Sequence, residues 1–262
     1  MRARWLLSLV VLLLGSFGGV VLRAEDKNSS APPEPPKPLV TMPLGLIAGR
    51  TNLVVVRGLR LKGATNVVVE GWTSPLSVVI RKREDAKPPD GLSAARAGDQ
   101  QLEVEVLVPA AVSGATNLVW KFSATNGVGM LSGIPVLSAE EWIESREPNG
   151  GFSDAQVLKV GQTVRGTLEK SGDVDVFRVD VAVGARLHAE VRASRIGSTL
   201  DAILTLYDQR GSLLASNDDA FDQDPAVDHT VSTAGPVFVV VTYANEKASK
   251  THGYLLRVEA VK

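Results

Sequence analysis

The chain has 262 residues, of which 44% are hydrophobic, and a formal net charge of −1 at pH 7. This length allows one large or two ordinary domains with real hydrophobic cores. The balanced charge argues against a nucleic-acid partner, which requires a basic face. Because the sequence contains no cysteine, it excludes disulfides, thiolate metal sites and a cysteine nucleophile.

The first 24 residues predict an export signal peptide. Arg2 and Arg4 precede an apolar run from Trp5 to about Leu22. We expect cleavage near Ala24 and a secreted, periplasmic or cell-envelope location. An uncleaved membrane anchor is the alternative, since about 18 apolar residues can span a bilayer. No later segment approaches that length, so we predict no further membrane span.

Residues 25–38 predict an extended linker, because their prolines favour a solvated polyproline conformation and they offer little apolar surface.

Residues 39–137 predict a small antiparallel β-sandwich, since short β-rich runs alternate with glycine- and proline-containing turns. The runs are Leu53–Val56, Asn66–Val69, Ser77–Ile80, Leu102–Val108 and Leu118–Phe122. Trp120 lies inside a run and is interpreted as a core residue, whereas Trp72 is open to a role in a ligand groove. Arg81–Arg83 are interpreted as solvated loop charges, with a basic contact patch as the alternative.

The order of turns and strands in residues 39–137 is similar to that of a known group of domains. The segments are Pro43-Leu44-Gly45, Gly49-Arg50-Thr51, Gly58–Ala64 and Val106–Pro109. In this order they resemble the IPT/TIG group of immunoglobulin-like domains. The resemblance implies an immunoglobulin-like binding or spacer module.

A short helical linker is predicted over residues 138–146. Ser138 is a good N-cap, and Glu140 and Glu141 place acidic side chains in the first turn. The residues after Glu147 include Pro148 and Gly150, which end this pattern, so we place the domain junction there.

Residues 147–262 predict a second β-sandwich, because about eight β-rich runs follow one another without a helical period. The runs are Val164–Leu168, Asp175–Val181, Ala185–Ala193, Ala202–Tyr207, Leu213–Ser216, Val227–Ser232, Val237–Tyr243 and Tyr254–Glu259. Val237–Tyr243 is apolar on both faces and is predicted as a central strand. The predicted fold class is therefore all-β, with two sandwiches joined by a short helix.

Ordered motifs in the same region match a known family. They are Glu147-Pro148-Asn149, Ala155, Gly161–Leu168, Gly172–Phe177, Gly197–Asp201, Leu204–Asp208, Asn217–Asp219, Gly235, Val237–Tyr243 and Tyr254–Val258. Together they resemble the bacterial pre-peptidase C-terminal domain. This resemblance implies a jelly-roll-like sandwich, found beside secreted peptidases and usually non-catalytic, some relatives of which bind calcium.

Asp173 and Asp175 are the first candidates for a cation site. They stand two residues apart in a stretch that runs into a strand, so both side chains share one face. The family resemblance adds Glu147 and Asn149 as calcium ligands. Ser145 stands where relatives often carry a second acid, and Glu144 is the candidate substitute. Turn and capping hydrogen bonds by the same side chains are the alternative.

A second acidic cluster offers more carboxylates than the candidate site around Asp173 and Asp175. It comprises Asn217, Asp218, Asp219, Asp222, Asp224 and Asp228, with Asp201 as a further candidate. Asn and Asp are common turn formers, so a structural loop is the preferred interpretation and a metal site the alternative.

The sequence carries no recognisable catalytic motif. His188, His229 and His252 are scattered, and neither a zinc His-Glu-x-x-His pair nor a Gly-x-Ser-x-Gly elbow is present. We therefore expect an exported, non-catalytic binding or accessory protein whose partner is an extracellular protein or polysaccharide. The alternatives are a secretion or processing appendage of a peptidase-type system, and a hydrolase with an undetected site in residues 39–137.

Overall fold

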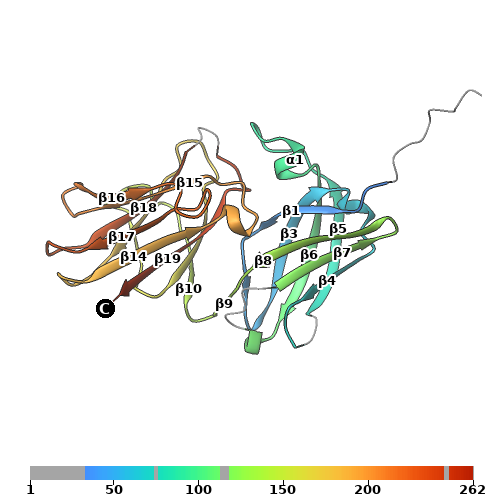
Figure 1. Ribbon diagram of the computed structural model, residues 1–262, viewed down its shortest axis with the longest axis horizontal. Coiled ribbons are helices and arrows are strands. Elements are labelled where there is room, and N and C mark those ends of the chain that lie inside the picture. The colour runs from blue at the N-terminus through green and yellow to red at the C-terminus, as the bar shows by residue number, and fades with distance from the viewer. Residues whose placement is uncertain (1–32, 74–75, 113–117, 245–247, 262) are drawn as a thin grey trace, which may run out of the picture. The chain divides into compact units, whose positions relative to one another are not determined.

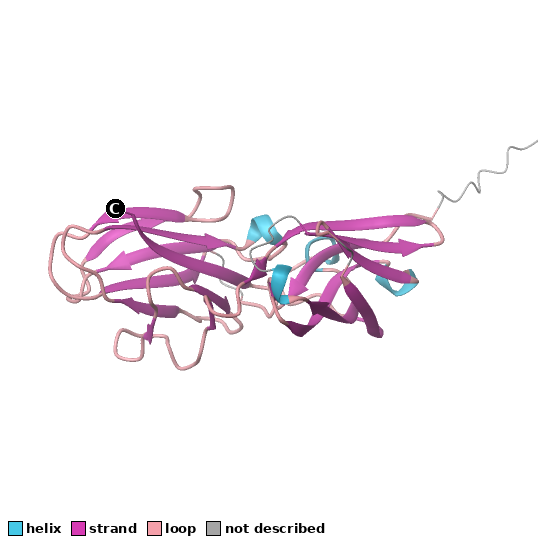
Figure 2. Cartoon of the chain, turned by 90° about the horizontal axis from the view of Figure 1, so that it is seen from below, coloured by secondary structure: helices cyan, strands magenta, loops and turns pink. Residues whose placement is uncertain are grey.

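The computed structural model describes residues 33–73, 76–112, 118–244 and 248–261. The predicted export signal lies outside these residues. Glu34–Lys262 form one compact unit, in which strands build two β-sandwiches (Figures 1 and 2). The predicted all-β fold class is confirmed. The part of the chain that is described contains no helix with the length and apolarity needed to cross a membrane.

Helical structure is limited to single turns in the described ranges. They are α1 (Ala94–Ala97) and the 3-10 turns η1 (Leu61–Gly63), η2 (Ala110–Val112) and η3 (Ser194–Ile196).

The first sandwich pairs a four-stranded sheet, β1-β3-β6-β5, with a three-stranded sheet, β4-β7-β8, and adds a short parallel pair, β2-β9. The strands are β1 Lys37–Met42, β2 Leu46–Ile47, β3 Arg50–Leu59, β4 Asn66–Glu70, β5 Ser77–Asp85, β6 Gln100–Val108, β7 Leu118–Ala124, β8 Gly127–Ile134 and β9 Val136–Leu137. All five predicted runs are strands. Trp120 is fully buried in the core against Phe122, whereas Trp72 is 40% exposed.

The prediction of a linker up to residue 38 is wrong at its end. β1 begins at Lys37 and pairs with β3, and both Pro36 and Pro38 are buried. A Cβ atom at Gly129 would lie 1.9 Å from the carbonyl oxygen of Pro36. The bare glycine in β8 therefore lets the proline segment pack directly on the sheet, a tertiary contact that composition does not reveal.

The prediction of a helix over residues 138–146 is also wrong. Ser138 does accept a hydrogen bond from the Glu140 amide at 3.3 Å, but only one turn forms. β10 (Trp142–Glu144) follows at once and pairs in parallel with Thr163–Arg165 of β12. Pairing with an existing sheet satisfies the backbone groups of this short segment better than an isolated helix of two turns.

The second sandwich consists of two five-stranded sheets, β10-β12-β19-β14-β17 and β11-β13-β18-β15-β16. The remaining bounds are β11 Gln156–Val157, β12 Thr163–Thr167, β13 Asp175–Val179, β14 Arg186–Arg192, β15 Ala202–Tyr207, β16 Leu213–Asn217, β17 Ala226–Thr230, β18 Val237–Tyr243 and β19 Gly253–Val261. All eight predicted runs are strands, and β18 is central as predicted.

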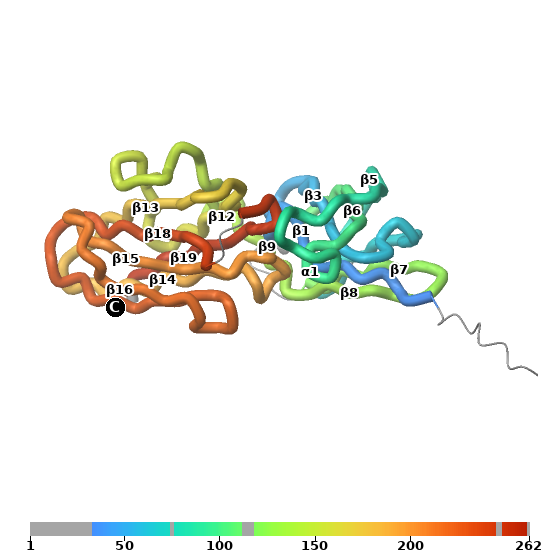
Figure 3. Tube along the Cα trace, turned by 90° about the horizontal axis from the view of Figure 1, so that it is seen from above, coloured from blue at the N-terminus to red at the C-terminus, as the bar shows by residue number. Residues whose placement is uncertain are grey.

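Three successive connections cross between these sheets at one edge of the sandwich. β10 and β12 belong to one sheet, while β11 and β13 belong to the other. The chain therefore passes from sheet to sheet three times, through residues 145–155, 158–162 and 168–174. In Figure 3 the yellow-green segment that precedes β13 forms the first of these crossings. This shared edge brings the predicted cation ligands together.

Candidate metal centre

Three of the predicted ligands converge at this edge. Glu147 lies in the first crossing (residues 145–155), Asp173 lies in the third (residues 168–174) and Asp175 begins β13. One carboxylate oxygen from each lies within 4.8 Å of the others. Among the residues that the structure describes, they are the one group of three or more acidic or histidine side chains that meets in this way.

Asp175 is the buried member of the group, with 1% of its surface exposed. Its Oδ2 atom accepts hydrogen bonds from the hydroxyl of Ser145, at 2.9 Å, and from the hydroxyl of Tyr254. Its Oδ1 atom is buried and has no hydrogen-bond partner in the described structure. The carboxylate is thus held by one oxygen while the other is left available.

Asn149 repeats this arrangement with an amide. The side chain is fully buried, and its Nδ2 atom donates to the Ser145 hydroxyl at 2.8 Å. Its Oδ1 atom is buried without a partner within the described ranges. Ser145 therefore accepts from Asn149 and donates to Asp175, which fixes both side chains. The serine that replaces an expected acid here orients two other candidate ligands.

The two remaining carboxylates are more exposed. Asp173 is half-buried, and its Oδ2 atom accepts from the backbone amide of Glu169 at 2.8 Å. Glu147 is exposed, and its Oε2 atom accepts a hydrogen bond from the backbone amide of Asn149 at 3.3 Å. Both turn interactions considered from the sequence therefore exist beside the convergence. Glu144, the proposed substitute acid, instead pairs with Arg165 at 3.1 Å and does not join the group.

Burial governs the proton affinity of Asp175. Burial raises the pKa of this carboxyl to about 6. The hydrogen bonds from Tyr254 and Ser145 lower the pKa, and the negative charge of Asp173 raises it further. Burial also raises the pKa of Tyr254, followed by the negative charge of Asp175, so the phenol remains a hydrogen-bond donor.

Tyr254 reaches Asp175 because of a glycine on the neighbouring strand. Tyr254 on β19 pairs with Gly166 on β12. A Cβ atom at position 166 would lie 2.3 Å from the tyrosine ring and its hydroxyl oxygen. Gly166 therefore provides the space that the fully buried ring occupies on its way to the carboxylate.

The residues present suit a calcium ion. Calcium takes about six to eight oxygen ligands at roughly 2.3–2.6 Å, so two ligands on opposite sides of one ion lie about 5 Å apart. The three carboxylate oxygens satisfy that limit. Two buried oxygens without donors, on Asn149 and Asp175, are costly unless a cation or water satisfies them. Glu147, Asn149, Asp173 and Asp175 would hold such an ion.

The second acidic cluster has structural roles in the described residues. The buried carboxylate of Asp224 accepts hydrogen bonds from the amides of Ala193, Ser194 and Arg195 and from the Arg195 guanidinium. Asn217 accepts from the Ala226 amide at 3.2 Å. These bonds tie the loop before β17 to η3, which is the structural interpretation preferred from the sequence.

The charged and histidine residues considered from the sequence lie among ordinary partners. Arg81 pairs with Glu105, Lys82 with Glu84, and Arg83 donates to the Ala64 carbonyl oxygen. His188 is half-buried between Asp228, at 3.2 Å, and Glu190, at 3.7 Å. His252 is 4% exposed and lies against the Tyr243 ring.

Sequence reasoning missed two residues of the centre. From the sequence, Ser145 is only a position that lacks the expected acid, and Tyr254 is only part of the closing strand. A tyrosine that falls on the buried side of a strand needs a partner for its hydroxyl, which is the one signal that pointed to a buried acceptor.

Comparisons with known proteins give partial matches. No family model matches the chain. A probable subtilase-type serine protease of Deinococcus radiodurans is 32% identical over 106 residues, which cover 39% of this chain and 15% of that protein. The chain therefore spans a small part of the length of this relative.

Among solved structures, the pre-peptidase C-terminal domain of collagenase from Bacillus anthracis matches 44% of this chain and 99% of its own, with 16% identity and a TM-score of 0.35. The predicted resemblance to this domain is confirmed. The secreted serine protease VesC from Vibrio cholerae matches 83% of this chain and 49% of its own, with 11% identity and a TM-score of 0.29. At these identities the similarity concerns the fold alone.

Proposed function

We propose that the chain is a non-catalytic accessory module of an exported protein, and that calcium bound at the shared edge of the second sandwich stabilises it. The observation that carries the proposal is the convergence of three carboxylates beside two buried oxygens that lack donors. Such a group gains most from a hard cation with flexible coordination geometry.

The position of the centre favours a stabilising role over a catalytic one. Its ligands come from the first and third crossings between the sheets and from the start of β13, so an ion would fasten residues 145–155 to residues 168–175. Two acids at 173 and 175 on one turn lack the substrate-wide separation of a glycosidase pair. The ion would act by holding these loops in place.

Calcium titration of residues 25–262, which include the whole compact unit, tests the proposal. Isothermal titration should give a binding heat, and calcium should raise the melting temperature, since a ligand that binds only the folded state stabilises it by mass action. Asp173→Asn and Asp175→Asn should lose both effects. Asp180→Asn, whose carboxylate is exposed and pairs with Arg178, is the matched control. Neither heat nor stabilisation at millimolar calcium would refute the calcium site.

The accessory role supplies a second test. An extracellular protein or polysaccharide is the proposed partner, and retention of the purified protein on insoluble protein or polysaccharide would support it. Retention on neither would count against binding.

A processing appendage is the second candidate, favoured by the partial match to a subtilase-type protease. That role predicts a shortened mature form. Mass spectrometry of envelope and culture fractions that finds the chain intact beyond residue 25 would contradict it.

A further inference from the structure

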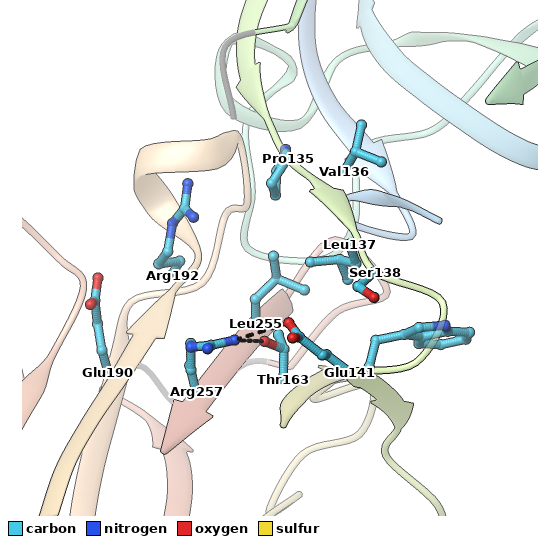
Figure 4. A pocket seen from close by; sticks show the side chains of 11 residues that line it. Pro135, Val136, Leu137, Ser138, Glu141, Thr163, Glu190, Arg192, Leu255 and Arg257 are labelled. Carbon is cyan, nitrogen blue, oxygen red and sulfur yellow. Dashed lines mark hydrogen bonds and ion pairs between the residues drawn. The ribbon is translucent and has the colours of Figure 1, made fainter. Parts of the chain in front are cut away.

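A pocket of about 470 Å³ lies on the outer face of the second sandwich (Figure 4), and its lining includes none of the four candidate calcium ligands. Its floor is the solvent side of three neighbouring strands, with Thr163 on β12, Leu255 and Arg257 on β19, and Glu190 and Arg192 on β14. Its other wall is the segment from Pro135 to Trp142. This volume is in the range of sites that hold small organic ligands.

Arg192 is the unusual residue of this pocket. It is half-buried, and among the described residues no hydrogen bond or ion pair engages its guanidinium group. Glu190, the acid nearest along the strand, is taken by Arg195 at 2.5 Å. Burial lowers the pKa of Arg192 and the positive charge of Arg195 acts in the same direction, whereas the negative charges of Glu190 and Asp224 oppose them. The half-buried Arg192 guanidinium therefore lacks a direct ion-pair partner among the described residues, which favours an anionic ligand at this position.

The rest of the pocket suits a ligand with an apolar end. Pro135, Val136, Leu137 and Leu255 form apolar walls, and the hydroxyls of Ser138 and Thr163 lie among them. Arg257, the other cation, already pairs with Glu259 at 2.7 Å and donates to Thr163 at 3.3 Å, and it lies 3.8 Å from Glu141, the other acid of the lining besides Glu190. One free guanidinium beside apolar walls matches one carboxylate next to one apolar side chain.

A carboxylated sugar has the same charge but would use the pocket differently. Trp142 is the aromatic residue of the lining, and its ring is the flat apolar surface on which a sugar ring would stack. Two guanidinium groups already lie over the Trp142 ring, with Arg165 at 4.7 Å and Arg50 at 5.7 Å from its centroid. The ring is therefore occupied, which favours a peptide over a sugar.

We infer that this pocket binds the free C-terminal carboxylate of a peptide that ends in an apolar residue. The Arg192 guanidinium group donates two parallel hydrogen bonds to the carboxylate, a geometry for which arginine is well suited. The walls take the last side chain, and the two hydroxyls meet the peptide backbone. This site is independent of calcium and goes beyond the accessory role proposed above.

Isothermal titration of the purified protein, covering residues 25–262, tests the inference with acetyl-Ala-Ala-Leu as the free acid and as its C-terminal amide. The acid should bind roughly 10- to 100-fold more tightly than the amide, since the loss of hydrogen bonds to a charged group weakens affinity by about that factor. Equal affinity of acid and amide, or no binding of the acid, would overturn the inference without any variant being made.

Arg192→Gln should reduce affinity for the acid by the same factor and leave the weak affinity for the amide unchanged. Arg186→Gln is the matched control, because Arg186 lies on the same strand, is exposed and pairs with Asp228 instead. Unaltered binding by Arg192→Gln with a normal melting temperature would refute the role of Arg192. Tighter binding of a galacturonate trimer than of the peptide would replace the peptide by an acidic sugar.

Discussion

The hydroxyl of Tyr254, on β19, donates a hydrogen bond to Oδ2 of Asp175 at the start of β13, and so joins the two sheets of the second sandwich through a buried polar contact. Ser145 donates to the same oxygen at 2.9 Å. Both donors bind one atom of the carboxylate, so the buried Oδ1 atom is left without a partner in the described structure. The candidate metal centre thus depends on residues that would not themselves touch an ion.

Replacement of Tyr254 by Phe tests this dependence. The variant removes one donor from a buried carboxylate, so we expect the free energy of unfolding without calcium to fall by about 1–3 kcal/mol and calcium affinity to weaken. Urea denaturation and calcium titration measure the two effects. Tyr207→Phe is the control, because Tyr207 lies on β15 and packs against Phe152. Unchanged calcium affinity in Tyr254→Phe would show that this bond does not orient Asp175.

A methyl group at position 166 should disrupt the same contact from the other side. Gly166→Ala places Cβ 2.3 Å from the Tyr254 ring, so the ring or β12 must move. Overpacking of this kind costs about 1–3 kcal/mol. Thermal unfolding followed by circular dichroism should show a lower melting temperature. Gly63→Ala, where a Cβ meets nothing within 4 Å, should leave it unchanged.

Phe152 should hold the first crossing, residues 145–155, in a fixed position. Its ring stacks on Phe238 with centroids 4.3 Å apart, which anchors the loop that follows Glu147 and Asn149. We expect Phe152→Ala to lose about 0.5–1.5 kcal/mol of aromatic stacking and to weaken calcium binding. Phe221→Ala removes an aromatic side chain from another loop. If both variants bind calcium like the unmodified protein, the anchor does not act on the centre.

His252 should make stability depend on pH. Burial lowers the pKa of this imidazole from 6.5 to about 4, and the charge of Arg96 adds to the effect. The unfolded chain takes up the proton first, so the contribution of neutral His252 is complete above pH 6.5 and is lost as the pH falls from about 6.5 to about 4. His252→Gln should flatten the profile of melting temperature in this window. Parallel profiles of the two proteins would contradict the assignment.

The strands of both sandwiches were predictable because their side chains alternate or are uniformly apolar, as in β14 and β18. The short edge strands β10 and β11 were not, since pairing with β12 and β13 creates them and three or fewer residues carry no period. The same competition turned the helix predicted after Ser138 into a strand.

Asp173 and Asp175 were predictable as a pair from their spacing alone. Their approach to Glu147 follows from two sheet crossings at one edge, which no local pattern encodes, and it was expected only from the family resemblance. Ser145 and Arg192 could not be assigned from sequence. Their roles depend on which neighbours hold, or do not hold, a hydrogen bond.

The position of β19 also has a consequence for synthesis. Although it is the last strand of the second sandwich, it lies between β12 and β14, in the middle of its sheet. Until residues 253–261 have left the ribosome, that sheet exists only as two separate halves, and its nascent strands have no complete surface to join. Folding of this sandwich can therefore be completed only after these residues have been made, and their removal by a protease would split the sheet rather than trim it.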